Sequence, residues 1–162
     1  FFSFSKGWNM GGFRLGFAIG AEKVITALKA VKSVIDFNQS LALQDGAIAA
    51  LKHSSDWSFK SLEIYRNRRD RTVNALFQMG WKVPIPTMAM YLWMPLPFWA
   101  RNRGWSDECF AKELLLNTGI SLSPGSGFGE GGRNWLRLAL VHPVDELEDA
   151  VSRMQLWWNA NS

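Results

Sequence analysis

The sequence contains a single cysteine and only two histidines. Because Cys109 has no second thiol to join, an intramolecular disulfide is excluded, and a reducing compartment is compatible with this composition. His53 and His142 have no partners at the spacing that a metal site requires, so we expect them at the surface or at helix caps. The composition argues against a disulfide-stapled scaffold and against a metal centre.

Long apolar runs are also missing. The longest uncharged apolar stretch, residues 87–100, is shorter than the roughly 20 residues that a membrane-spanning helix needs, and Pro95 and Pro97 interrupt it. No basic and then apolar leader opens the chain. We therefore expect a soluble, cytoplasmic protein with no membrane partner.

A strong excess of one charge is absent as well, since the net charge is only +4. The one dense basic run, residues 66–71, contains Asp70 and follows Glu63. On a helix these charges spread over more than one face and can pair at i,i+3 or i,i+4. The pattern favours a solvated helix surface over a nucleic-acid patch. The nine tryptophans are scattered, so we expect no nucleic-acid partner.

The opening segment, residues 3–16, places Lys6 eight positions before Arg14. The lysine amine can form a Schiff base with an aldehyde, and the planar guanidinium can hold a phosphate. Fully extended, eight residues would separate the two by roughly 26 Å, which is too far for one small cofactor. The chain must therefore fold back, and Asn9 with Gly11-Gly12 supplies permissive backbone for this return.

Arg137 lies inside an apolar run, residues 135–140. Burying a guanidinium there is costly unless it meets an anion, although strand alternation would also allow it to point to solvent. The preceding segment, residues 127–132, matches G-x-G-x-x-G, but a dinucleotide site needs a helix directly afterwards. Because a strand is predicted there, we interpret these glycines as a flexible connection that delivers Arg137.

Periodic patterns predict helices and strands in both halves of the chain. The predicted helices cover residues 21–36, 40–53, 56–79, 107–118 and 144–159, and the predicted strands cover residues 13–20, 81–83, 90–94, 120–123 and 134–140. Residues 21–36 carry an apolar stripe typical of an amphipathic helix, and residues 54–56 offer an N-cap for the long third helix. The first half thus needs a larger sheet beneath its helices, whereas the second half forms a compact α+β unit.

Five blocks of the sequence follow one another in an order typical of a known enzyme family. They are the lysine signature Ser3–Gly16, then Tyr65–Asp70, Met90–Pro97, Ser123–Gly129 and Asn134–Leu140. Together they resemble the class I/II aminotransferases of fold type I. The resemblance implies an α/β fold, the C-terminal part of the fold type I PLP-transferase fold. It divides the chain into a remnant of the large α/β domain, residues 1–58, and the small α+β C-terminal domain, residues 59–162, entered through a long helix.

The resemblance also implies pyridoxal 5'-phosphate as the cofactor and gives roles to four residues. Lys6 would be the catalytic residue that holds the cofactor and moves a proton, while Ser3 and Arg14 would bind the cofactor phosphate. Arg137 would clamp the α-carboxylate of the substrate. The parent would be a homodimer that transfers an amino group from an amino acid to a 2-oxo acid. Since the family's N-terminal half has no counterpart here, we expect a C-terminal portion that is inactive alone.

Other functions are compatible with the same residues. A pyridoxal-phosphate-dependent lyase on this fold would keep Lys6, Arg14 and Arg137 and differ in its product. A regulator could use such a domain as a sensor, with a DNA-binding domain upstream, and an interaction module could carry a vestigial site. Arg137 indicates an α-carboxylate but not which amino acid, although the pattern resembles aspartate- or diaminopimelate-type enzymes.

Overall fold

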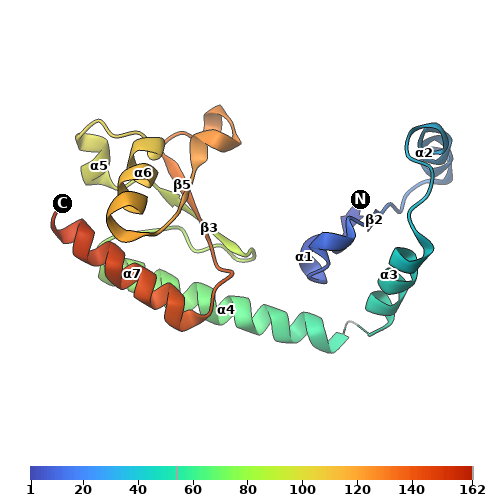
Figure 1. Cartoon of the computed structure of the whole chain (residues 1–162), viewed down its shortest axis with the longest axis horizontal. Coiled ribbons are helices and arrows are strands. Elements are labelled where there is room, and N and C mark those ends of the chain that lie inside the picture. Colours follow the sequence, from blue (N-terminus) through green and yellow to red (C-terminus); the bar gives the residue numbers. More distant parts are fainter. Residues whose placement is uncertain (54, 162) are drawn as a thin grey trace. The chain divides into compact units, whose positions relative to one another are not determined.

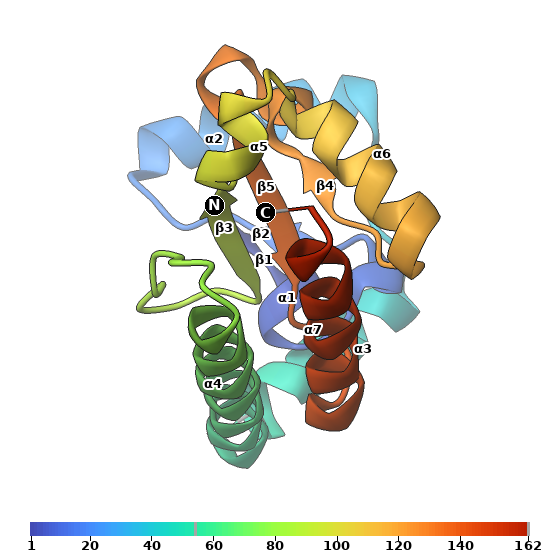
Figure 2. The ribbon, with the colours of Figure 1, turned by 90° about the vertical axis from the view of Figure 1, so that its left-hand side faces the viewer.

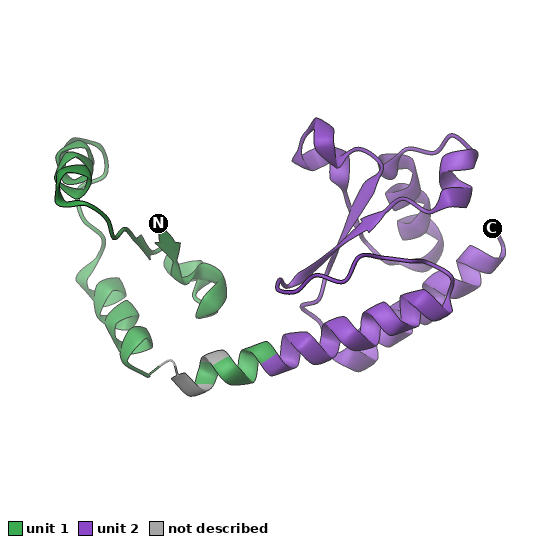
Figure 3. Cartoon of the chain, turned by 180° about the vertical axis from the view of Figure 1, so that it is seen from behind, with its two compact units in different colours: residues 1–62 green, residues 63–162 purple. Residues whose placement is uncertain are grey.

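The computed structural model describes residues 1–53 and 55–161 and separates the chain into two compact units, Phe1–Leu62 and Glu63–Ser162 (Figure 1 and Figure 3). Helix α4, Ser55–Gln78, begins in the first unit and ends in the second. The N-cap predicted at residues 54–56 lies outside the side chains that are described. Within the described ranges, none of the helices has the length and apolarity to span a bilayer.

The first unit is built on a short hairpin followed by helices. Its elements are β1 (Phe2–Ser3), α1 (Phe4–Gly7), η1 (Gly11–Phe13), β2 (Gly16–Phe17), α2 (Glu22–Ile35) and α3 (Leu41–His53). Strands β1 and β2 pair antiparallel with Ser3 opposite Gly16. A small core of Phe4, Leu15 and Ala47 forms beneath this hairpin. Two apolar residues within the lysine signature, Phe4 and Leu15, therefore hold it in place together with Ala47 of α3.

Of two predictions for the first unit, the structure confirms the helix and shortens the strand. The helix predicted over residues 21–36 is confirmed as α2, but its apolar stripe is solvent-exposed, with Val24 at 62%, Val31 at 53% and Ile35 at 72%. The strand predicted over residues 13–20 is wrong in length, because only Gly16–Phe17 pair. A strand extends only as far as a partner offers backbone groups, and β1 offers two residues. The stripe of α2 is not covered by the described residues of its own unit.

The second unit is a three-stranded sheet packed against helices (Figure 2). After α4 its elements are β3 (Tyr91–Pro95), α5 (Phe98–Asn102), α6 (Asp107–Thr118), β4 (Ser123–Pro124), η2 (Gly125–Phe128), η3 (Glu130–Gly132), β5 (Trp135–Ala139) and α7 (Val144–Asn159). The strands are antiparallel in the order β3-β5-β4, and β5 sits at the centre. The α+β unit predicted for this half of the chain is confirmed.

Side chains alternate across this sheet with the period of two that a strand imposes. On one face Leu92, Met94, Leu136 and Leu138 are buried and form the core with α4, α6 and α7. Arg137 falls between Leu136 and Leu138, so it lies on the opposite, half-buried face. Arg137 has a neighbour on each side in the sheet, because Trp93 of β3 and Ser123 of β4 both pair with it.

Two predicted strands of the second half are absent or shortened. Residues 81–83 are irregular although Trp81 and Val83 are buried, and the strand predicted over residues 120–123 is reduced to Ser123–Pro124. The indole N–H of Trp81 donates to the Pro95 carbonyl at 2.9 Å. Core packing and this side-chain hydrogen bond hold residues 81–83 in place, although the segment is not part of a β-sheet. A short apolar run predicts burial better than it predicts a strand.

The arginines of α4 bind within the second unit. Arg68 donates to the carbonyl of Leu140 at 3.1 Å, and Arg69 donates to the carbonyl of Pro86 at 3.0 Å. Arg71 forms an ion pair with Glu148 of α7 at 2.7 Å. The prediction of a solvated helix surface is therefore wrong for Arg68 and Arg69, which are half-buried. These guanidinium groups tie α4 to the chain segments that flank β3 and β5.

Candidate functional site

The lysine signature forms one closed loop in the first unit. Ser3 pairs with Gly16, and the amide of Phe4 donates to the carbonyl of Leu15 at 3.2 Å. Lys6 lies two residues after Phe4, in α1. The predicted return of the chain between Lys6 and Arg14 is confirmed, because both ends of the signature meet in this hairpin.

The return uses Asn9, as predicted, but it uses Arg14 in place of Gly11-Gly12. Positive φ angles occur at Asn9 (53°) and at Arg14 (51°), which both adopt the left-handed region. Gly11 and Gly12 lie instead in the 3-10 helix η1. Asparagine tolerates this conformation, but arginine adopts it at a cost, and such strained residues concentrate at functional sites. The bend at Arg14 fixes where its side chain leaves the backbone.

The donor groups of this loop fit pyridoxal phosphate. Lys6 offers a primary amine for the aldehyde, and Arg14 offers a guanidinium whose hydrogen bond within the described residues goes to the Gly11 carbonyl at 3.3 Å. The Ser3 hydroxyl oxygen accepts a bond from the Ser5 amide at 3.1 Å, which leaves its own proton to donate. Lys6 and Arg14 are exposed, and neither belongs to an ion pair among the described residues. One amine, one hydroxyl and one cation match one aldehyde and one phosphate.

Gly16 is the position where this loop tolerates no side chain. A Cβ placed there would lie 2.6 Å from the Phe2 carbonyl oxygen. We expect Gly16→Ala to destabilise the protein by about 1–3 kcal/mol and to displace Ser3, its strand partner. The check is chemical denaturation of the intact protein together with its cofactor content.

Gly12→Ala is the matched control for this prediction. A Cβ at Gly12 meets no atom within 4 Å, and its φ is not positive. We expect its stability and cofactor content to stay near those of the unchanged protein. Equal effects of the two substitutions would contradict the role given to Gly16.

Arg137 has an environment of aromatic rings in the second unit. Its guanidinium carbon lies 4.5 Å from the ring centre of Tyr91 and 4.4 Å from that of Phe128. One nitrogen donates to the Ser123 hydroxyl at 3.4 Å. No ion pair among the described residues includes Arg137, so its charge is balanced by ring faces and a hydroxyl rather than by a carboxylate. A half-buried guanidinium in this state can accept an anionic ligand.

The loop after β4 is fixed by the carboxylate of Asp107, which is 3% exposed. Its two oxygens accept bonds from the amides of Ser126 at 2.8 Å and Asn134 at 3.2 Å. Desolvation raises the pKa of this carboxyl, but the hydrogen bonds from Ser126 and Asn134 outweigh it, so the pKa of Asp107 lies below its usual value. The carboxylate is therefore ionised at neutral pH and holds both ends of the loop.

The stability conferred by Asp107 should depend on pH. Because its pKa is lower in the folded protein than in the unfolded chain, its contribution is present above the unfolded pKa and is lost as the pH falls through the folded pKa. We expect Asp107→Asn to cost about 1–3 kcal/mol near neutral pH, since one buried amide loses its acceptor.

The measurement is the denaturation free energy of both proteins at neutral pH and at a pH below the folded pKa of Asp107. We expect the difference to shrink in acid. Glu108 and Arg133 are the other charged residues around this carboxylate, and both variants retain them. A difference that stays constant with pH would contradict the ionised role of Asp107.

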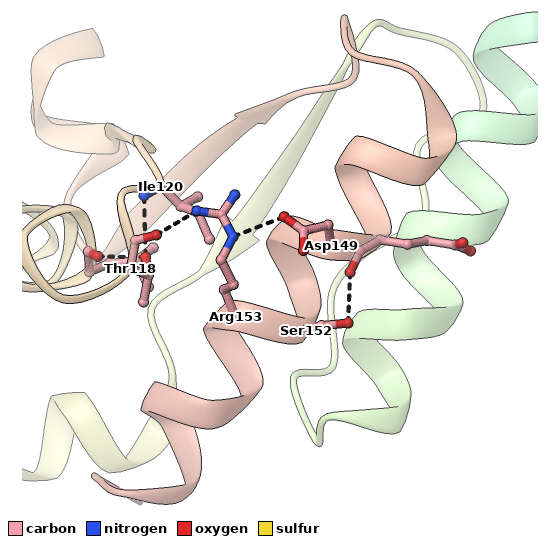
Figure 4. Close-up of polar contacts among 7 residues, drawn as sticks. Thr118, Ile120, Asp149, Ser152 and Arg153 are labelled. Carbon is pink, nitrogen blue, oxygen red and sulfur yellow. Dashed lines mark hydrogen bonds and ion pairs between the residues drawn. The ribbon is translucent and has the colours of Figure 1, made fainter.

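A hollow of about 590 Å³ in the second unit lies elsewhere. It is bounded by residues 119–122 and by α7, and Arg137 does not line it. Arg153 pairs there with Asp149 at 3.0 Å and donates to the Thr118 carbonyl at 2.7 Å (Figure 4). The Arg153 guanidinium is thus already bound to groups of the protein. In the part of the chain that is described, no three His, Cys, Asp or Glu side chains gather to hold a metal.

The structure places the predicted residues in two groups. Ser3, Lys6 and Arg14 share the hairpin loop of the first unit, and Arg137 lies on the sheet of the second. Sequence reasoning gave no role to Tyr91, Phe128 or Asp107. The two aromatic residues stand inside blocks that carry the family resemblance, which was an available signal. Asp107 follows the N-cap Ser106, so its position in the sequence is that of an ordinary first residue of a helix.

Comparison with known proteins gives a consistent result. The profile of a family described as "Aminotransferase class I and II" matches residues 1–154. LL-diaminopimelate aminotransferase of Dehalococcoides mccartyi is 40% identical over 154 residues, which cover 95% of this chain and 38% of that protein. Glutamate-pyruvate aminotransferase AlaC of Escherichia coli is 35% identical over 99% of this chain and 39% of its own length.

Solved structures agree with the sequence matches. Substrate-bound BacF of Bacillus subtilis superposes with a TM-score of 0.88 at 30% identity, over 96% of this chain and 39% of that one. A probable N-succinyldiaminopimelate aminotransferase of Thermus thermophilus gives a TM-score of 0.84 at 38% identity, over 96% and 40% of the two chains. The chain thus spans about two fifths of the length of these relatives.

Proposed function

The chain belongs to the class I and II aminotransferase family, and we propose from this that the protein carrying it transfers an amino group from an amino acid to a 2-oxo acid. The family match over residues 1–154 is the observation that carries the proposal. The family's cofactor is pyridoxal phosphate, as the sequence predicted, and the fold is that of the predicted C-terminal part. The residue roles below belong to the proposal.

We assign the cofactor to the hairpin loop of the first unit. Bound pyridoxal phosphate supplies an electron sink that makes the α-proton of an amino acid removable. Lys6 would hold the cofactor through its ε-amine and would move a proton at the α-carbon of the substrate. The Arg14 guanidinium and the Ser3 hydroxyl bind the phosphate with charge-assisted hydrogen bonds. The short hairpin that joins Ser3 to Gly16 supports this assignment.

We assign the α-carboxylate of the substrate to Arg137. Its planar fork can make two parallel hydrogen bonds to a carboxylate, which a single point charge cannot. The absence of a carboxylate partner among the described residues supports this role, because a substrate then supplies the missing anion. By fixing the carboxylate, Arg137 would hold the bound amino acid in one orientation.

We further propose that the two units correspond to parts of two domains. Residues 1–58 would form the C-terminal remnant of the large cofactor-binding domain, and residues 59–162 the small domain. The match to about two fifths of each relative supports the view that this segment alone is inactive. The active form would be a homodimer of the longer protein.

The experiment is an amino-transfer assay on the protein that carries this chain, with pyridoxal phosphate added. The relatives' names give LL-diaminopimelate and glutamate as first donors and pyruvate as a first acceptor. Alanine and 2-oxoglutarate, the products of transfer from glutamate to pyruvate, complete the panel. We expect equal amounts of a new amino acid and a new 2-oxo acid. Release of ammonia with a 2-oxo acid and no new amino acid would indicate the lyase instead.

A further inference from the structure

Phe128 is held in place by a chain of contacts that begins at Asp107. Phe128 ends the 3-10 helix η2, whose second residue, Ser126, donates its amide to Asp107 at 2.8 Å. The Ser126 hydroxyl also bonds Glu108 at 3.3 Å. The loop therefore has two carboxylate contacts with α6 at its start.

The other end of this loop is fixed at the same place. The Asn134 amide donates to the second oxygen of Asp107, and β5 begins one residue later. The backbones of Gly125 and Gly132 cross so closely that a Cβ at Gly125 would lie 2.1 Å from the Gly132 carbonyl oxygen. The loop from Ser126 to Asn134 thus leaves and returns at one buried carboxylate.

Phe128 meets Arg137 from this fixed loop. Its ring centre lies 4.4 Å from the guanidinium carbon, and the ring packs in a T-shaped arrangement with Trp93 at 5.6 Å between ring centres. The Phe128 side chain is 53% exposed, so it contributes little to the core. Its contact with the cation is a cation–π interaction, which favours guanidinium orientations that stay over the ring.

We propose that Asp107 and Phe128 are positioning residues for carboxylate binding: Asp107 fixes the loop, and the loop sets Phe128 against Arg137 so that the guanidinium keeps one orientation. This inference rests on the proposed function of Arg137. It assigns no contact with the substrate to Asp107. It follows that the affinity for the substrate depends on the buried carboxylate of Asp107, although this group does not contact the substrate.

The test is steady-state kinetics of the full-length enzyme with pyridoxal phosphate, at a temperature at which every variant is folded. Phe128→Leu keeps apolar bulk but removes the ring face, and we expect it to raise KM for amino acid and 2-oxo acid about 2- to 30-fold with little change in kcat. Phe128→Tyr keeps the ring and should restore a KM near the original. Asp107→Asn should raise KM in the same way.

Two further variants separate this inference from its alternatives. Glu130→Gln, on the same loop, removes an exposed carboxylate that pairs with Arg133, and it should leave KM unchanged. In the double variant of Asp107→Asn and Phe128→Leu, the effects should not add, because both act through one ring. Full additivity would overturn the proposed route from Asp107 through Phe128.

The outcomes also distinguish the two proposals. If Arg137→Gln raises KM but Phe128→Leu and Asp107→Asn do not, the positioning role is wrong and the clamp stands. If Arg137→Gln leaves KM unchanged, the clamp and the positioning role are both wrong.

Discussion

Lys6→Ala in the full-length protein should lower kcat/KM for amino transfer by about 10³-fold or more, because it removes both the anchor of the cofactor and the group that moves the proton. Lys6 lies in α1, inside the loop closed by the Ser3 and Gly16 pair. It forms no ion pair with the described residues, so no such contact gives it a role in stability. The measurement is single-turnover and steady-state transfer with the donor that the panel identifies.

Two other variants test whether the chemistry of Lys6, rather than its charge, is required. Lys6→Arg keeps a cation but cannot act as a proton carrier near neutral pH, so we expect a loss close to that of Lys6→Ala. Lys23→Ala removes an exposed lysine of α2 and should leave activity unchanged. Activity retained in Lys6→Arg would contradict the proposed role of the amine.

Arg137→Gln should raise KM for both the amino acid and the 2-oxo acid by about 30-fold or more, since removing one partner of a desolvated charge pair costs roughly 2–5 kcal/mol. Arg137→Lys should recover little of this loss, because an ammonium cannot make the two parallel bonds of a guanidinium. The measurement is the KM of each substrate at saturating concentration of the other.

The matched control is Arg133→Gln, four residues earlier. Arg133 is exposed and pairs with Glu130 at 2.7 Å, so its loss should change KM little. Equal effects at the two arginines would indicate a general electrostatic contribution, and an unchanged KM in Arg137→Gln would contradict the clamp.

Local patterns in the sequence predicted the parts of the fold that local physics controls. The helices at residues 21–36 and 144–159 follow apolar periodicity and are confirmed as α2 and α7. The return of the chain between Lys6 and Arg14 was predicted from the reach of an extended backbone. That the bend falls at Arg14 rather than Gly11 was not predicted, because residue preference alone favours glycine there.

Features that depend on distant partners were not predictable in this way. Asp107 bonds amides 19 and 27 residues away, so nothing near it in the sequence marks it as more than a helix start. The arginines of α4 were predicted to be solvated, but Arg68 and Arg69 reach carbonyl groups of remote segments. The strand length at residues 13–20 failed for a related reason, since the partner strand β1 offers only two residues. The strand predicted over residues 120–123 was also too long, because β4 pairs with β5 only through Ser123 and Pro124.

The most direct measurement of the central proposal is borohydride reduction of the full-length protein loaded with pyridoxal phosphate, followed by mass spectrometry of its peptides. Reduction makes the bond between a lysine amine and the aldehyde carbon permanent, so the modified residue can be identified. We predict a pyridoxyl group on Lys6. No adduct, or an adduct on a different lysine, would contradict the assignment of the cofactor to this loop.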